Sequence, residues 1–231
     1  MKEHIAHRLK KMSFGYIFCL FLISSCGGSQ YSDAGKAVAD SFGANEVKVT
    51  MTKTTNGIPR MDLAIIDPAV PDGYAIERIQ STGSLILYRN LPENVNEECE
   101  MYEVTVTQGG KSEFRNYSIT ELKRADQAVF NAAVLLEWDT SRGILDAVPV
   151  VDNEFISDSM LWNVSNLLHE LDSAGGKPVK RIVTGFRPDK FKESGEDVTV
   201  VWGEIQREKS LDEFVFYVRA SNGRVVYMEV N

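Results

Sequence analysis

The sequence has few of the residues from which metal and nucleophile sites are usually built. Its 231 residues include 3 cysteines and 3 histidines. Only one histidine, His169, lies beyond the first ten residues, and zinc enzymes of the common kinds bind their metal through two or three histidines. A zinc protease or a carbonic-anhydrase-type site is therefore excluded, and the sequence predicts no cofactor.

Several catalytic motifs are also missing. The chain has no Gly-rich phosphate loop, no nucleophile elbow and no Cys-x-x-Cys pair. With 43% hydrophobic residues, 25% charged residues and only 7 prolines, the composition is that of a folded globular protein. We therefore expect a folded protein that is not an enzyme, with enzymatic activity as the third-ranked class of function.

The most pronounced apolar run lies near the N-terminus. Residues 12–23 are mostly apolar and follow four basic residues within positions 2–11. This run is too short to span a bilayer comfortably, and its basic flank is typical of a secretory signal peptide. The sequence predicts a signal peptide over residues 1–25.

The end of this run has a recognisable pattern, Leu22-Ile23-Ser24-Ser25-Cys26. It resembles the lipobox of bacterial lipoproteins, a resemblance confined to the first 27 residues. In that family the chain is cut before the cysteine, which then carries diacylglycerol on its thiol and usually an acyl chain, such as palmitate, on its amino group. The resemblance implies lipidation at Cys26 and attachment to the lipid bilayer, where two or three acyl chains anchor a protein durably. The alternatives are a non-lipidated signal peptide and an uncleaved N-terminal anchor.

The segment after Cys26 indicates where the protein works. Residues 26–32 form a short polar tether that, as a flexible coil, spans roughly 14 Å. No acidic run follows Cys26, which favours a protein that faces the periplasm. We expect a cell-envelope lipoprotein at the outer membrane, although the sequence does not separate the inner from the outer membrane.

Removal of the signal peptide leaves an acidic chain. Residues 26–231 contain 21 Lys and Arg against 32 Asp and Glu, a net charge of −11. Such a charge repels nucleic acid and anionic bilayer surfaces, so neither is an expected ligand, and it favours a basic protein partner. Cys99 would be the only cysteine besides lipidated Cys26, so no intrachain disulfide is expected. The acidic neighbours of Cys99 also argue against a catalytic thiol there.

The C-terminal third predicts one helix followed by an antiparallel sheet. A helix over 158–172 has Leu161, Val164, Leu168 and Leu171 along one stripe. Strand-like runs follow at 180–186, 197–206, 212–220 and 224–230, joined by short turns such as Ser221-Asn222-Gly223. Strands joined this way form a four-stranded meander. Apolar residues alternate onto both faces of this meander, so either a second layer, such as the helix at 119–138, covers the far face, or that face is a pocket or a partner surface.

The first half predicts similar parts. A helix is expected at 32–42, and one at 119–138 is introduced by the capping box Ser118-Ile119-Thr120-Glu121. Between them the pattern predicts a hairpin around Asn56-Gly57 with one solvated face, a short strand at 85–88, and a second hairpin around Gly109-Gly110.

These elements predict an α+β fold in which helices pack on antiparallel β-meander sheets. The expected divisions are an N-terminal α+β half (33–118), a connecting helix and loop (119–157), and a C-terminal helix plus β-meander (158–231). A helix followed by strands occurs in both halves, which leaves open an α-β pseudo-repeat.

The candidate functional surface is aromatic. We expect a pocket or interface in the C-terminal region, and the candidate residues are Trp162, Trp202, Phe214, Phe216 and Tyr217. One hypothesis is a non-enzymatic module that binds a protein partner beside the membrane through its acidic surface or its two-sided sheet; a narrower form is an inhibitor or immunity protein against a basic secreted enzyme. The alternative is a periplasmic carrier of a small ligand or lipid, whose apolar pocket would be lined by the aromatic side chains.

Two polar features complete the candidates. Ser165, His169 and Asp172 share a helix face, but one helix cannot easily orient a triad, and we expect His169 to interact with the helix end and Asp172. The acidic stretches at 67–72 and 93–100 lack the spacing of a calcium-binding EF-hand loop, so we expect solvated loops and no metal site.

Overall fold

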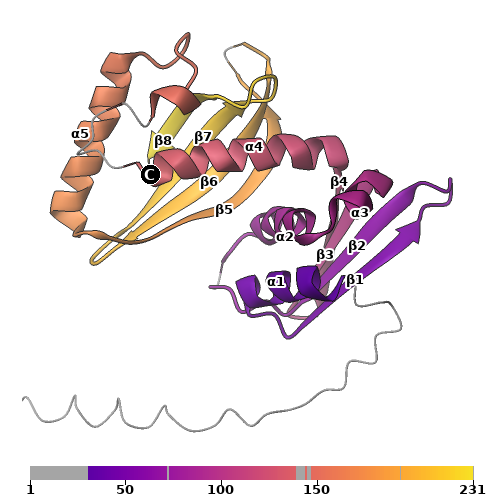
Figure 1. The fold of residues 1–231 in the computed structure, drawn as a ribbon. Helices are drawn as coiled ribbons and strands as arrows, with labels where there is room; N and C mark the ends of the chain where they lie inside the picture. Colours follow the sequence, from indigo (N-terminus) through magenta and orange to yellow (C-terminus); the bar gives the residue numbers. More distant parts are fainter. Residues whose placement is uncertain (1–30, 72, 139–143, 145–146, 193, 231) are drawn as a thin grey trace, which may run out of the picture.

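The computed structural model describes residues 31–71, 73–138, 144, 147–192 and 194–230. These residues form five α-helices and two four-stranded sheets, which confirms the α+β class (Figure 1). The helices are α1 (Ser32–Phe42), α2 (Ile76–Asn90), α3 (Glu93–Glu98), α4 (Ile119–Leu136) and α5 (Asp158–Gly175), and one 3-10 turn spans Val148–Val150. The strands are β1 (Glu46–Lys53), β2 (Pro59–Ile66), β3 (Met101–Gln108), β4 (Lys111–Ser118), β5 (Pro178–Lys190), β6 (Asp197–Arg207), β7 (Leu211–Arg219) and β8 (Val225–Val230).

The first sheet, sheet A, has the order β1-β2-β3-β4. Its outer pairs are the two expected antiparallel hairpins, but β2 and β3 run parallel and are connected through α2 and α3. The expectation of purely antiparallel sheets therefore fails for this one pair. One face of sheet A is buried and the other is solvated, as the alternation of β1 and β2 predicts.

The prediction of a short strand at 85–88 is wrong, because these residues belong to helix α2. The buried side of α2 includes the small residues Ser81, Gly83 and Ser84, which hide the apolar periodicity of a helix. A Cβ atom at Gly83 would lie 2.8 Å from Ile65 Cδ1, so α2 approaches sheet A too closely for a larger side chain.

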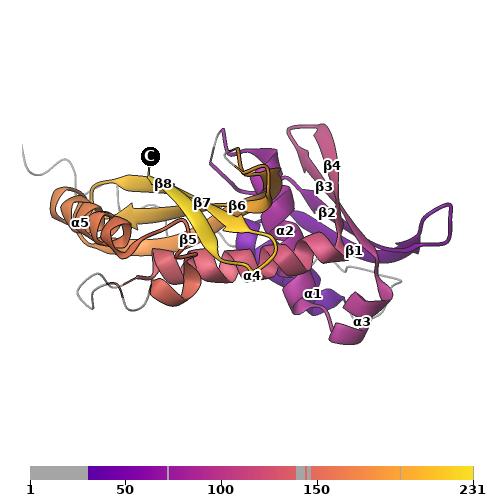
Figure 2. The ribbon, with the colours of Figure 1, turned by 90° about the horizontal axis from the view of Figure 1, so that it is seen from above.

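The second sheet, sheet B, is the expected all-antiparallel meander β5-β6-β7-β8. Helix α4 lies across one of its faces (Figures 1 and 2). The capping box at the start of α4 is confirmed: the Glu121 amide donates to Ser118 Oγ at 3.1 Å, and the Ser118 amide donates to Glu121 Oε2 at 2.7 Å. The side chain of Leu136 in α4 packs closely against Gly203 of β6. A Cβ atom at position 203 would lie 2.6 Å from Leu136 Cδ1.

Helix α5 lies on the same side of sheet B as α4 (Figure 2). Its residues Leu161 and Leu168 are buried in the core cluster that also contains Phe214 and Phe216 of β7. The two helices therefore cover one face of sheet B together. For the other face of this sheet, the sequence left open either coverage by the helix at 119–138 or a pocket or partner surface. Coverage by that helix is not observed, because α4 and α5 lie on the same face.

Helix α2 joins the two halves and lies between sheet A and β5 (Figure 1). The Phe186 amide of β5 donates to Ser81 Oγ at 3.1 Å, and the rings of Tyr117 in β4 and Phe186 are 5.7 Å apart. One buried core cluster consequently extends through both halves. The two sheets differ in topology, because sheet A contains a parallel crossover and sheet B does not.

The expected signal peptide and Cys26 lie outside the described residues. Among the residues that are described, none of the helices combines the length and apolarity needed to cross a bilayer.

Candidate functional site

The face of sheet B turned away from α4 has no described helix lying along it (Figure 2). Residues on adjacent strands that pair directly share a face, and the register pairs Trp202 with Val215, and Tyr217 with Tyr227. Trp202, Val215 and Tyr217 are partly buried, because they pack against a small buried cluster of Phe191, Val198, Val200 and Val226, and Tyr227 is 41% exposed. We call the surface formed by Trp202, Val215, Tyr217 and Tyr227 the open face.

Aromatic rings form one end of the open face. Phe191, which follows β5, lies 5.9 Å from the ring of Tyr217 and 6.2 Å from that of Tyr227. Phe155 contacts Phe191 edge-on at 6.3 Å, and the two tyrosine rings are 5.5 Å apart. These separations are typical of favourable aromatic pairs, so the tyrosines are held in place while their outer surfaces stay exposed.

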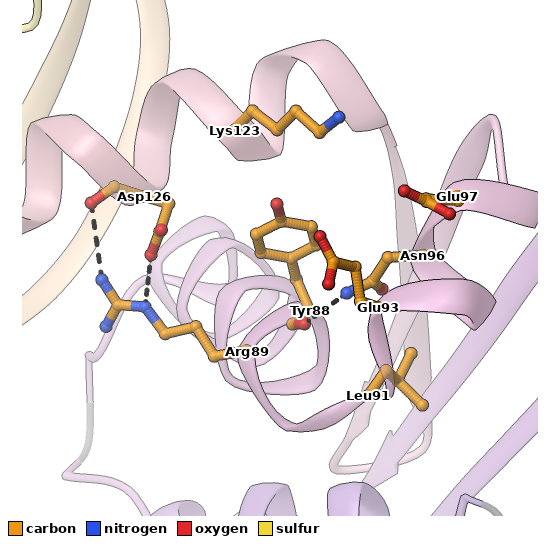
Figure 3. Close-up of a pocket in the computed structure, with 8 residues that line it drawn as sticks. All are labelled: Tyr88, Arg89, Leu91, Glu93, Asn96, Glu97, Lys123 and Asp126. Carbon is orange, nitrogen blue, oxygen red and sulfur yellow. Dashed lines mark hydrogen bonds and ion pairs between the residues drawn. The ribbon is translucent and has the colours of Figure 1, made fainter.

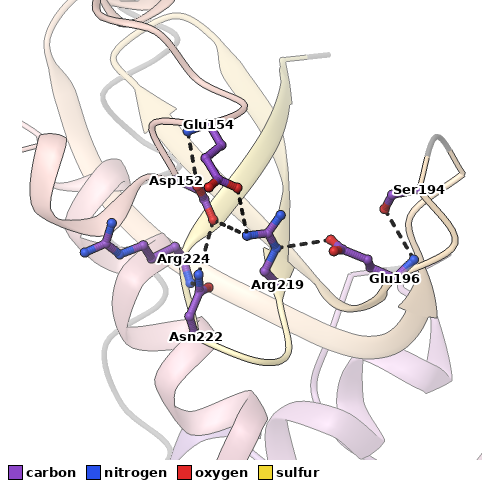
Figure 4. Close-up of polar contacts among 7 residues, drawn as sticks. All are labelled: Asp152, Glu154, Ser194, Glu196, Arg219, Asn222 and Arg224. Carbon is purple, nitrogen blue, oxygen red and sulfur yellow. Dashed lines mark hydrogen bonds and ion pairs between the residues drawn. The ribbon is translucent and has the colours of Figure 1, made fainter.

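A buried ion-pair network fixes this end (Figure 4). Arg219 donates through Nη1 to Asp152 Oδ2 at 2.6 Å and through Nε to Glu196 Oε2 at 3.1 Å. Its guanidinium carbon also lies 4.7 Å from the centre of the Phe155 ring. Asn222 donates a further hydrogen bond to Asp152 at 3.2 Å. Because Arg219 and Asp152 satisfy each other, this network positions Phe155 and leaves no buried charge free to bind a ligand.

The other end of the open face is polar. The guanidinium carbons of Arg78 and Arg187 lie 5.3 and 5.5 Å from the centre of the Trp202 ring. Arg78 comes from α2, and its Nη1 lies 3.4 Å from Glu204 and 3.3 Å from Glu213. Two cations against one indole are a favourable arrangement, and they hold Trp202 at the surface.

Two groups on this surface have shifted pKa values. Burial raises the pKa of the Glu204 carboxyl, and Arg78 opposes this shift while Glu213 adds to it. Burial also raises the pKa of Tyr217, with a further contribution from Glu229. Tyr217 therefore remains a neutral phenol at physiological pH, which suits it to contact both apolar and polar groups.

The five candidate residues from the sequence do not lie together. Phe214 and Phe216 are buried on the helix-covered face, with their rings stacked 6.2 Å apart. Trp162 is 50% exposed on α5, away from the strands that carry the open face. Only Trp202 and Tyr217 share one surface, so these aromatic side chains do not line a common cavity.

Two hollows in the described structure are lined by polar residues, in the second together with an equal number of apolar ones. One of about 330 Å³ lies between α2, α3 and α4, where Arg89 pairs with Asp126 at 2.5 Å and Lys123 faces the carboxylates of α3 (Figure 3). The other, of about 260 Å³, lies where α4 ends and includes Arg181 and Arg207. None of the five candidate aromatic residues lines either hollow.

The remaining sequence candidates show no catalytic arrangement. Asp172 pairs with Arg207, not with His169 as expected, and Ser165 is buried while His169 is exposed. Residues 93–98 form helix α3 where a loop was expected, and Asp72 lies outside the described residues. In the described part of the chain, no group of three or more His, Cys, Asp or Glu residues is placed to hold a metal ion.

Cys99 follows α3 and is buried. Burial, with a smaller contribution from Glu98, raises the pKa of its thiol, in the direction that the acidic neighbours predict. A raised thiol pKa lowers the fraction of reactive thiolate.

Comparison with known proteins gives no relative. No protein-family model, no curated protein and no solved structure matches the chain.

Several residues of this surface were not among the sequence candidates. The turn at 221–223 does not predict the position of Tyr227, because the register shifts by one residue between the Val218–Val225 and Tyr217–Tyr227 pairs, and this irregularity places Tyr227 opposite Tyr217. Arg78 and Phe155 could not be predicted either, because they reach the open face from α2 and from the segment before α5, which no local pattern connects to sheet B.

Proposed function

We propose that the protein is a non-enzymatic lipoprotein of the bacterial cell envelope that binds a basic protein partner through the open face of sheet B. The observation that carries this proposal is the open face, where Trp202, Val215, Tyr217 and Tyr227 remain partly exposed although they are held rigidly from both ends. Aromatic side chains whose rotamers are already fixed lose little entropy on binding, and tyrosine and tryptophan are enriched in protein interfaces.

Charge supports a basic partner. Glu204, Glu213 and Glu229 lie beside the aromatic residues on the strands of the open face, and Arg78 is shared between the first two. The chain from Cys26 onward carries a net charge of −11. A field of this sign accelerates encounter with a positively charged protein and disfavours acidic ones.

The proposed anchor places the module close to the membrane. Helix α1 begins at Ser32, only six residues after Cys26, and packs with the sheet A half. Acylation at Cys26 would therefore hold sheet A nearest to the outer membrane's periplasmic leaflet. The carrier hypothesis receives less support, because charged side chains line both of these hollows and none of the candidate aromatic residues lines either.

The experiment is site-specific photo-crosslinking in cells. The photoreactive residue p-benzoylphenylalanine replaces Tyr227 on the open face, and in a matched control it replaces Phe114, which is 68% exposed on the solvated face of sheet A. We expect position 227 to give a discrete adduct with another protein, and position 114 to give none. Cys26→Ala should weaken the adduct, since the protein would no longer be held beside its partner. Equal labelling from positions 227 and 114 would contradict the proposal.

A further inference from the structure

The outer edge of β8 carries little of the usual protection of a strand edge. At the opposite edge of sheet B, the Thr184 carbonyl of β5 accepts from Tyr74 and the Phe186 amide donates to Ser81. In sheet A, β1 carries Lys48 and Lys53, and the Glu113 carbonyl of β4 accepts from Gln80. Lysines, prolines and covering elements are the usual protection of an edge, whereas β8 has the sequence VVYMEV with one charged residue.

The protein begins to add a fifth strand to this edge. Val151 forms a single parallel bridge with Val225, and the Asp152 amide donates to the Val225 carbonyl at 2.8 Å. The chain then turns at Asp152, whose carbonyl accepts from Phe155 and Ile156. Among the described residues, this pairing reaches only the first residue of β8 on its outer side.

The register shows which backbone groups of β8 point outward. The Arg219 amide donates to the Arg224 carbonyl, so Arg219 directs its backbone toward β8. Backbone groups alternate along a strand, so Tyr217 and Val215 do the same, and their partners Tyr227 and Glu229 point back toward β7. Met228 and Val230 therefore direct their amide and carbonyl groups away from the sheet.

We propose that this outer edge receives an extended, basic segment of the partner protein as a fifth strand of sheet B. The inference rests on the proposed function and specifies how the partner binds. Backbone hydrogen bonds to Met228 and Val230 would supply affinity. Alternate side chains of the added strand would extend the open face beside Tyr227 and Glu229, where a basic residue meets the Glu229 carboxylate.

Charge favours this occupant over a second copy of the chain. Two β8 edges that use both outward residues would pair antiparallel, with Met228 opposite Val230 of the other copy. This register places Glu229 directly opposite Glu229 of the second copy, in a non-hydrogen-bonded pair where side chains are closest. Like charges in that position destabilise a sheet, whereas a lysine or arginine in the partner strand would stabilise it.

The test uses the full chain in cells, with the crosslinker at position 227. Val230→Pro removes one outward amide without removing a hydrogen bond to β7, and proline is tolerated at strand edges. Val230→Ala is its matched control. Glu229→Lys reverses the charge that faces the added strand, and Glu170→Lys makes the same change in charge on the exposed side of α5.

We expect Val230→Pro to abolish the adduct and Val230→Ala to retain it. Glu229→Lys should reduce the adduct yield about tenfold, because an exposed attraction becomes a repulsion, while Glu170→Lys should leave it unchanged. Far-UV circular dichroism of each purified variant shows whether it is folded. If Val230→Pro does not fold, the adduct yield of Glu229→Lys tests the inference.

Three results would overturn the inference. An adduct that persists in full in both Val230→Pro and Glu229→Lys would show that the partner binds the open face without the edge, and the proposed function would stand. An adduct composed of two copies of this chain would assign the edge to self-association. If the protein with the crosslinker at position 227 and no other substitution gives no adduct, the proposed function is wrong, and the proposed fifth strand is wrong with it.

Discussion

Arg207 is the most deeply buried guanidinium described in this structure. Its side chain is 1% exposed and contacts Asp212 of β7 at 2.5 Å and Asp172 of α5. These contacts join the end of α5 to the turn between β6 and β7. A buried charge of this kind is tolerated only while its partners neutralise it, so the stability of the junction depends on two carboxylates.

At the residue scale, we predict that Asp212→Ala destabilises the protein by about 3–5 kcal/mol, because it leaves Arg207 buried with only partial compensation. Urea denaturation followed by circular dichroism measures the change. The control is Asp189→Ala, which removes an exposed partner of Arg187 and should cost less than about 1 kcal/mol. Equal losses for the two variants would show that Arg207 does not need Asp212.

At the element scale, helix α2 has the most roles, and the sequence patterns did not predict it. It contacts sheet A through Gly83 and β5 through Ser81, and it sends Arg78 to the open face. Helices α4 and α5 were predictable because each has a regular apolar stripe and a cap. Helix α2 was not predicted, because it contacts neighbours on two sides. Close contact on both sides requires small residues at positions where a helix that packs on one side has large apolar residues. The parallel pairing of β2 and β3 depends on this helix and was missed with it.

Arg78 gives α2 a pH-dependent role. Burial raises the pKa of Glu204 above its ordinary value, so the folded state favours the protonated carboxyl, and stability from this group is lost as pH rises through its folded pKa. Arg78 offsets that loss. We predict that Arg78→Met destabilises the protein by about 1–3 kcal/mol at pH 7, and by less at pH 4, where Glu204 is largely protonated.

The matched control is Arg187→Met. It also removes a cation from Trp202, but its ionic partner is exposed Asp189. Its effect, measured by urea denaturation at both pH values, should be small and nearly independent of pH. A loss for Arg78→Met that is equal at pH 4 and pH 7 would contradict the role assigned to Glu204.

At the scale of the whole molecule, the two sheets share one core cluster that passes through α2. The C-terminal meander and the helices that cover it were predictable from local patterns, as were the two hairpins of sheet A. The open face was predictable only in part, since Tyr217 and Trp202 follow from strand alternation while the arginines that hold Trp202 come from tertiary contacts.

We predict that both halves unfold in one transition, because separating them would expose α2 and the Tyr117–Phe186 contact to water. Pulsed alkylation of Cys99, read by mass spectrometry, reports the half that contains sheet A, and far-UV circular dichroism reports the whole chain. The two urea midpoints should coincide. Alkylation of Cys99 at clearly lower urea would instead indicate that the sheet A half unfolds first.

The position of Trp202 beside two guanidinium groups has an optical consequence. The three tryptophans lie in different surroundings: Trp138 is buried, Trp162 is 50% exposed on α5, and Trp202 is partly exposed on the open face. The emission of an indole depends on nearby charge and on water. A partner that displaces Arg187 or excludes water from the open face should therefore shift the fluorescence of Trp202 and leave that of Trp138 unchanged, so the protein carries its own reporter of occupancy at the surface proposed to bind.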